Sequence, residues 1–246
     1  MVETSMQRRQ FTAALLPLGA LLRGAVRVGA GVGASAWATG PAWAAGLTEG
    51  DASLGIRSAM ERGATAAIGS LGRSDGFLGN PKVRIGLPGS LANAARLLKA
   101  TGQQHKVDEL VTAMNRAAEA AMPQARTLLV STAKAISVSD AISIVRGGEQ
   151  SVTEYFARKT RAPLTEQFLP IVSRETEKVA LVEKFNAVAG PAAKLGLLKA
   201  DESNVERYVT AKALDGLYLM IGEEERKIRA DPIGTGSAIL RKVFGG

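Results

Sequence analysis

Apolar residues recur every three or four positions along most of the chain after residue 47, and this spacing restricts the fold to packed helices. The cleanest runs cover residues 56–71 and 107–121, and a last long helix is expected over residues 204–230. Strands that alternate with helices, the pattern of α/β proteins, do not occur. The sequence therefore predicts an all-α, single-domain multi-helix bundle over residues 45–246.

One short segment departs from the helical pattern. Residues 82–87 alternate between polar and apolar side chains and place Val83, Ile85 and Leu87 on one side. A period of two is typical of extended backbone. We therefore expect at most one short extended arm, either a single strand or an ordered segment that lies across helices.

Turn and cap residues divide the bundle into its helices. A serine or threonine followed three positions later by an acid forms a capping box, and three are expected, at Thr48/Asp51, Ser137/Asp140 and Ser151/Glu154. Pro123 should kink or restart a helix because proline lacks the N–H that the helical ladder needs. Pro163 is placed at the start of a helix, and Asp231-Pro232 should end the last long one.

The first 44 residues have the order of an export signal. Arg8-Arg9 with Phe11 precede an apolar stretch over residues 12–22, and Ala42-Trp43-Ala44 matches a signal-peptidase site. The paired arginines indicate the twin-arginine route, which exports folded proteins. The general secretory route and a Gly/Ala-rich tail are the alternatives. We expect cleavage near Ala44 and a periplasmic location for residues 45–246.

The apolar stretch of this signal is too short to span a membrane. Arg23 and Arg27 interrupt it, whereas a spanning helix needs about 20 apolar residues. No transmembrane segment is therefore expected in the mature chain.

Charge and cysteine content limit the partners. Removal of residues 1–44 takes four basic residues and one acid from a net charge of +8 and leaves +5. For an exported protein this excess favours anionic envelope components over nucleic acid. An ordinary solvated surface of mixed charge is the alternative. Because there is no cysteine, neither disulfides nor lipid attachment at cysteine is expected.

Five segments carry a resemblance to a known family: Leu71–Phe77, Asn115–Ala121, Ser139–Ala141, Tyr208–Leu217 and Lys242–Gly245. In this order they resemble the bacterial envelope proteins grouped as domain of unknown function 4197, from about Leu47 to the C-terminus. Members usually begin the first helix with Gly-Leu-Lys-Glu-Ala-Leu, where this chain has Gly55-Ile-Arg-Ser-Ala-Met60. The resemblance implies an exported helical protein and supplies no catalytic residue.

A polar cluster on the 107–121 helix is the first candidate site. Asn115 and Glu119 lie one turn apart, and Arg116 can pair with Glu119. Glu119 is therefore a candidate acid or base at a cleft. The structural interpretation, which we favour, is a hydrogen-bonded lock between helices.

The last long helix carries all but one of the remaining candidates. Glu224 falls on the stripe of Leu217, Ile221 and Ile228, so we expect a buried structural carboxylate paired with Arg229 or another arginine, and a lower melting temperature for Glu224→Gln. Lys212 and Asp215 are three positions apart, next to Gly216, and a glycine inside a helix indicates close packing of the backbone more often than a site. Tyr155 and Tyr208 are candidates for ligand binding, with core packing as the alternative.

Two classes of function fit these residues. The first is a non-enzymatic binding or scaffold protein of the bacterial envelope. The second is a carboxylate-dependent hydrolase of an envelope polymer or ester, in which Glu119 or Glu224 would face Asp215, Glu154 or Glu225 across a cleft. We expect neither a metal nor a cofactor, because His105 is the only histidine and cysteine is absent.

The export hypothesis makes the first prediction. Mass spectrometry of the protein recovered from the envelope should find an N-terminus near Ala45, because Ala42-Trp43-Ala44 supplies the small residues that signal peptidase requires. Replacement of Arg8-Arg9 by Lys-Lys should stop export by the twin-arginine route, and export that survives the change indicates the general pathway. An intact N-terminus in the cytosolic fraction would contradict export altogether.

Overall fold

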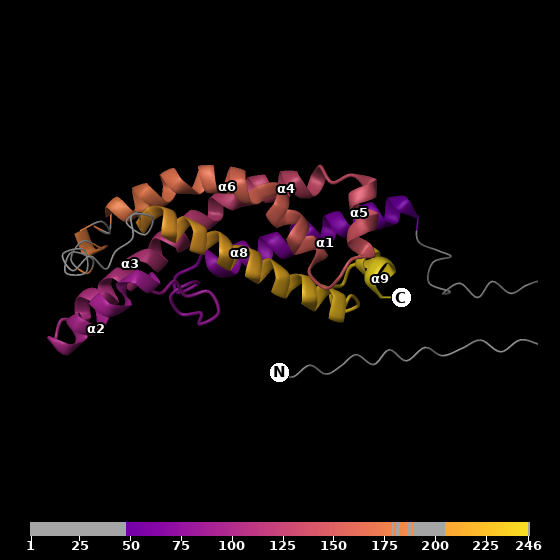
Figure 1. Cartoon of the computed structure of the whole chain (residues 1–246). Helices are drawn as coiled ribbons and strands as arrows, with labels where there is room; N and C mark the ends of the chain where they lie inside the picture. Colours follow the sequence, from indigo (N-terminus) through magenta and orange to yellow (C-terminus); the bar gives the residue numbers. More distant parts are fainter. Residues whose placement is uncertain (1–47, 179, 181–182, 186–187, 189–204, 246) are drawn as a thin grey trace, which may run out of the picture. The chain divides into compact units, whose positions relative to one another are not determined.

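The computed structural model describes residues 48–245 apart from 179, 181–182, 186–187 and 189–204. The described residues form helices and connecting segments without a β-strand (Figure 1). The longer helices are α1 (Glu49–Leu71), α3 (Gln104–Ala121), α6 (Ser151–Lys178) and α8 (Val205–Ala230). The shorter ones are α2 (Ala92–Ala100), α4 (Ala125–Lys134), α5 (Val138–Val145) and α9 (Ala238–Phe244). The all-α prediction is confirmed, and residues 1–44 lie outside the described part.

Helices α6 and α8 organise the core. Helix α8 packs along both α1 and α6, and α3 and α4 also pack against α6. Helices α5 and α9 cover α1. The predicted stripe on α1 is buried throughout, and the interior is filled chiefly by small and medium apolar side chains, with Phe77, Phe156 and Phe168 as the largest. Apolar area removed from water along these stripes is the main force that holds the helices together.

Several helix ends follow the local sequence. The hydroxyl of Thr48 accepts the Asp51 N–H, while the Thr48 N–H donates to Asp51, so the predicted capping box at α1 is confirmed. Ser137 likewise caps α5 by accepting the Asp140 N–H. Pro123 lies in a short 3₁₀ turn, η3 (Met122–Gln124), where α3 ends and α4 restarts. These ends form where expected because the interactions involve only neighbouring residues.

Helix α6 departs from the prediction in two respects. Ser151 does not cap it through Glu154, because its hydroxyl instead donates to the Ile144 carbonyl. Pro163 does not begin a helix, since Pro163 and Pro170 both lie inside the 28 residues of α6. Each proline leaves the carbonyl four residues earlier without its helical partner. Both of those earlier residues, Lys159 and Glu166, are exposed, which lets water replace the missing bond.

The predicted arm is ordered but is not a strand. Val83 and Ile85 are buried and Leu87 is partly buried, whereas Arg84 between them is exposed. The alternation therefore places the apolar side chains against the helices, as expected. After the arm, a 3₁₀ turn, η2 (Gly89–Leu91), leads into α2.

Gly216 allows this region to approach α8 closely. A Cβ atom at Gly216 would lie 2.7 Å from a ring carbon of Phe77 and 3.3 Å from Cβ of Val83. No side chain fits in that space, which is the close packing predicted for this glycine. Gly216 thus fixes the distance between α8 and the segment that contains the arm.

The last helix is docked on the first. Val243 lies against Gly55 so closely that a Cβ at Gly55 would overlap it. Lys242 pairs with Asp51, and its hydrogen bond lowers the pKa of Asp51 to about 2, with the capping Thr48 acting in the same direction. Because this pKa is lowered by folding, the pair contributes stability above pH 3.8 and loses it as the pH falls towards 2.

None of the helices in the described ranges is by itself long and apolar enough to cross a membrane. One bent pair, Gln104–Lys134 with Val138–Val145 at 98°, reaches that length and composition only when its two parts are taken together.

The packing at Gly216 makes the second prediction. Gly216→Ala should lower the melting temperature, because the added methyl group collides with a buried ring, at a cost of about 1–3 kcal/mol, which outweighs the gain of about 1 kcal/mol in helix propensity. Gly69→Ala is the matched control, since Gly69 also lies inside a helix but has no atom within 4 Å of its Cβ position. Gly69→Ala should raise the melting temperature. Equal shifts from the two variants would contradict the close packing.

Candidate functional site

Asn115 joins α3 to the arm. It is completely buried, its Oδ1 accepts the Ile85 N–H at 2.8 Å, and its Nδ2 donates to the Ile85 carbonyl at 2.8 Å. Nδ2 also donates to the Val111 carbonyl at 2.7 Å. Asn115 therefore provides the pair of hydrogen bonds that a neighbouring strand would give the arm, and it has no polar atom left for a ligand.

Glu119 ties α3 to the loop that follows α1. Its Oε1 accepts the N–H groups of Phe77 and Leu78 at 3.0 and 3.1 Å, and its Oε2 pairs with Arg116 at 2.7 Å. Arg116 also pairs with Asp75 of the same loop at 2.7 Å. The hydrogen bond to Glu119 is the main reason that the pKa of Arg116 is raised. The structure thus brings the predicted trio together, but its partners are loop segments and not a second helix.

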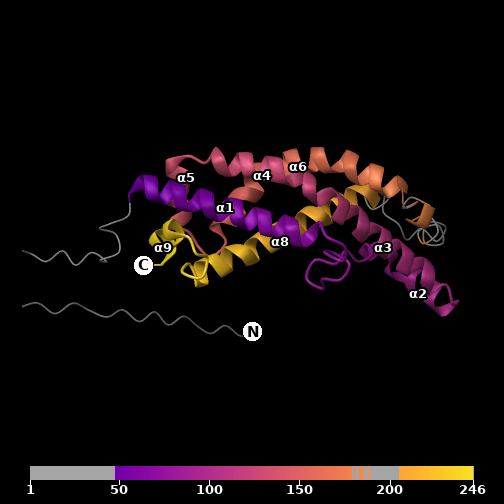
Figure 2. The same cartoon turned by 180° about the vertical axis from the view of Figure 1, so that it is seen from behind.

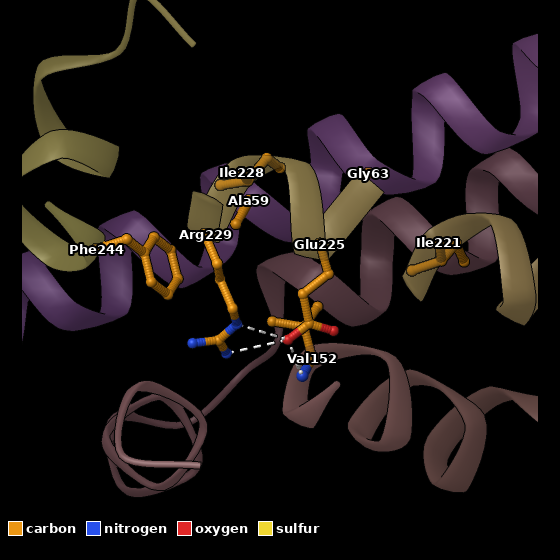
Figure 3. Close-up of a pocket in the computed structure, with 8 residues that line it drawn as sticks. All are labelled: Ala59, Gly63, Val152, Ile221, Glu225, Ile228, Arg229 and Phe244. Carbon is orange, nitrogen blue, oxygen red and sulfur yellow. Dashed lines mark hydrogen bonds and ion pairs between the residues drawn. The ribbon is translucent and has the colours of Figure 1, made fainter. Parts of the chain in front are cut away.

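A second buried glutamate, Glu225, lies where α1, α6, α8 and α9 meet (Figure 3). Its carboxylate accepts the N–H groups of Val152 and Thr153 at 3.0 and 2.9 Å and the Thr153 hydroxyl at 2.8 Å. Arg229, one turn further along α8, pairs with it at 3.0 Å. Glu225 therefore caps the N-terminus of α6 from another helix and replaces the cap predicted at Ser151.

Arg229 extends this cluster to two further elements. Its Nη2 donates to the Ser151 hydroxyl at 2.7 Å and to the Ile144 carbonyl at 3.3 Å. The guanidinium carbon of Arg229 lies 4.8 Å from the centre of the Phe244 ring, a cation–π contact. Figure 3 shows the two side chains beside each other. A single arginine thereby connects the end of α5, the start of α6 and the C-terminal helix to α8.

The prediction that Glu224 is the buried carboxylate is wrong. Glu224 is partly exposed and pairs at 2.6 Å with Lys227, whose side chain is 66% exposed. The buried residue is its neighbour Glu225, which takes the expected partner Arg229. By helical period alone both positions fit the apolar stripe, because residues seven and eight positions after Leu217 both lie close to its face of the helix, but only Glu225 is buried.

Asp215 and Lys212 lie on the outer face of α8. Asp215 pairs with Arg161 of α6 at 2.9 Å and with Lys212 at 3.5 Å, and all three side chains are about half exposed. Exposed pairs of this kind contribute roughly 0–1 kcal/mol. The structure does not place Asp215 beside Glu119 or Glu225 in a shared hydrogen-bonded cluster.

The two candidate tyrosines are anchored differently. Tyr208 donates to the Gly86 carbonyl at 3.0 Å and so holds the end of the arm. Tyr155 is buried and donates to Asp140 at 3.4 Å. Burial raises the pKa of both tyrosines, and Asp140 raises that of Tyr155 further. Because both pKa values are raised above the ordinary value for tyrosine, neither hydroxyl loses its proton near neutral pH.

The hollow spaces around these residues differ in size. The cavity beside Glu225 and Arg229 has a volume of about 10 Å³, too small for any ligand larger than one water. A hollow of about 220 Å³ between α5 and α6 is lined by residues that include Asp140, Glu154 and Tyr155. An open groove of about 570 Å³ on α3 includes His105, Glu109 and Lys184. In that groove, the hydrogen bond from Lys184 lowers the pKa of Glu109.

The carboxylates considered for catalysis are mostly engaged. Glu119, Glu224, Glu225 and Asp215 each form an ion pair, and Glu154 is the one for which no ion pair is found in the described residues. The same residues contain no group of three or more His, Asp or Glu side chains arranged to hold a metal. The polar clusters therefore have the geometry of structural contacts that hold helices and loops together.

Sequence analysis missed a basic segment that the structure makes visible. From Gly76 to Val107 the chain has no aspartate or glutamate, but it has five cationic residues, Lys82, Arg84, Arg96, Lys99 and Lys106. Their charge equals the whole net charge of residues 45–246. The overall charge count concealed this segment, although the run without acids was readable in the sequence. The segment covers the arm, α2 and the first turn of α3.

The fold and these clusters define an all-α domain in which two buried glutamates bind backbone N–H groups of neighbouring segments and so connect the long helices to them. Residues 46–245 match the family described as protein of unknown function, DUF4197, and the chain belongs to that family. The resemblance noted from the five sequence segments is thereby confirmed. No curated protein and no solved structure matches the chain.

Those five segments contain residues of the contacts described above. Residues 139–141 contain Asp140, which accepts a hydrogen bond from the Tyr155 hydroxyl. Residues 71–77 and 115–121 supply the two sides of the Glu119 cluster. Residues 208–217 contain Tyr208, which donates a hydrogen bond to the end of the arm, and Gly216, which leaves space for Val83 of the arm. Residues 242–245 contain Phe244, which stacks on Arg229. The segments that identify the family are thus segments that hold the helices together.

The Glu225 cluster makes the third prediction. Glu225→Gln should lower the free energy of unfolding by about 3–5 kcal/mol, because it leaves Arg229 largely buried without its counter-charge. Glu224→Gln, the adjacent control, should change it by less than about 1 kcal/mol, because its pair is exposed. Urea denaturation followed by circular dichroism measures both. A larger effect at Glu224 would restore the original assignment.

Proposed function

We propose that the chain is a non-enzymatic binding or scaffold protein of the bacterial envelope that is exported to the periplasm and binds anionic envelope components. The single observation that carries this proposal is the concentration of net positive charge in residues 76–107. The rest of residues 45–246 has balanced charge. A local excess of one sign attracts partners of the opposite sign.

Location supports the choice of partner. The family match begins at residue 46, directly after the expected cleavage site at Ala44. The paired arginines and the Ala-x-Ala site that precede it have the order of an export signal. In the envelope, phosphate- and carboxylate-bearing lipids and polymers are the available polyanions, and nucleic acid is not expected there.

The geometry of the carboxylates supports a binding role over the hydrolase alternative. A glycosidase-type mechanism needs two carboxyl groups that face each other across a space for substrate. Glu119 and Glu225 instead spend their oxygens on backbone N–H groups and arginines. The hydrolase alternative is thereby reduced to Glu154, which lines the 220 Å³ hollow with Asp140, and Glu224, which lines an open groove of about 550 Å³ with Asp231.

Retention on envelope material makes the fourth prediction. The full chain should sediment with isolated envelope material at about 0.05 M salt and be released at about 1 M, because the screening length falls to about 3 Å. Beads of an uncharged polysaccharide serve as the control and should retain little protein. Absence of retention on any envelope fraction at low salt would contradict the proposed function. Hydrolysis of that material, abolished by Glu154→Gln, would favour the alternative.

A further inference from the structure

The basic segment has a distinct end, formed by α2 and the first turn of α3. Helix α2 packs against α3 through Ala94 and Leu98, which are buried. In both views α2 lies at the end of the described helices that is remote from α9 (Figures 1 and 2). We call the side chains of Arg96, Leu97, Lys99 and Lys106 the α2 tip.

The charges of the α2 tip are not neutralised by the described part of the protein. Arg96 and Lys99 are exposed and form no ion pair there. Lys106 donates to the side-chain amide of Gln103 at 2.6 Å, and an amide leaves its charge intact. Lys82, in the same acid-free segment, differs because Glu223 pairs with it at 2.6 Å. The available charge of the segment is therefore greatest at the tip.

Leu97 adds an apolar group to this charged surface. Its side chain is 47% exposed, whereas Ala94 and Leu98 form the buried face of α2. It therefore contributes little to the core, and it lies next to Arg96 in the chain. A helix with Lys and Arg on its polar face and an exposed leucine on another face is typical of segments that bind at the boundary between lipid headgroups and acyl chains.

We infer that the α2 tip is a docking surface for an anionic phospholipid bilayer, with the cations at the headgroup phosphates and Leu97 at the acyl boundary. This inference rests on the proposed function and names its partner. Charge complementarity supports any polyanion, but a purely hydrophilic polymer would leave Leu97 without a contact. Each Lys or Arg close to an anionic bilayer increases binding roughly fivefold. The expected attachment is peripheral and reversible, with no helix inserted across the bilayer.

The first test measures sedimentation of the full chain with vesicles of phosphatidylglycerol and phosphatidylcholine. The triple variant Arg96→Gln, Lys99→Gln, Lys106→Gln should bind roughly 100-fold more weakly than the unchanged chain. The control triple variant is Arg126→Gln, Lys134→Gln, Arg146→Gln, which removes the same charge from exposed residues of α4 and the α5 end. The control should weaken binding less than tenfold. Residues 1–44 are present in every variant and contribute equally.

The second test reports on the site of contact. Because the chain has no cysteine, Leu97→Cys carries a single environment-sensitive nitrobenzoxadiazole label. Leu219→Cys is the matched control, since Leu219 on α8 is 44% exposed. Vesicles should shift the emission of the label at position 97 to shorter wavelength and leave the label at position 219 unchanged. Phosphatidylcholine vesicles alone should shift neither label.

The outcomes separate this inference from the proposed function. Equal weakening by the two triple variants, or an unshifted label at position 97 on bound protein, overturns the α2 tip as the docking surface. Retention on envelope polymers without binding to anionic vesicles overturns the bilayer as partner and leaves the proposed function standing. Equally strong binding to duplex DNA that is lost in the tip variant also overturns it, because the surface would then be a general polyanion site. Unchanged melting temperatures show that the variants are folded.

Discussion

The arrangement of the helices depends on the contacts of the buried Glu225 carboxylate with the start of α6 and with Arg229. The carboxylate accepts the first free N–H groups of α6 and pairs with Arg229, which in turn bonds to the end of α5 and stacks on α9. Unsatisfied N–H groups at a buried helix end are costly, and a buried carboxylate without a partner is costlier still. The carboxylate satisfies the N–H groups, and the N–H groups and Arg229 stabilise the buried carboxylate. These polar contacts therefore connect four helices in addition to their apolar packing.

The same solution occurs a second time around Glu119. That carboxylate also accepts two consecutive backbone N–H groups and pairs with an arginine on its own helix. Here the recipient is a loop in which Asp75 has a positive φ of 61°, an unfavourable conformation for a residue with a side chain. The hydrogen bonds to Glu119 and the Asp75–Arg116 pair hold the loop in that conformation. Two glutamates thus fix the two irregular junctions that helical packing alone would leave loose.

Local interactions decided how far sequence could predict this structure. Three local predictions are confirmed: the cap at Thr48, the break at Pro123 and the close approach at Gly216. The cap involves residues three positions apart, and proline and glycine are unfavourable inside a helix whatever their neighbours. The choice between Glu224 and Glu225 depends instead on the start of α6, 73 residues away along the chain. No helical period distinguishes two adjacent glutamates on a broad buried face. The cap expected at Ser151 failed for the same reason, because a distant carboxylate took its role.

The docking of α9 on α1 couples the first helix of the domain to the last. The notch at Gly55 and the pair between Asp51 and Lys242 are completed only by residues at the very end of the chain. Leu240 also fills a small separate cluster with Ala59 and Ile228. During synthesis, therefore, the part of α1 around Gly55 and Ala59 stays uncovered until α9 has been made, although α4, α5 and α8 can already pack on the rest of α1. A nascent chain that has not yet reached α9 exposes this apolar strip of its first helix to water.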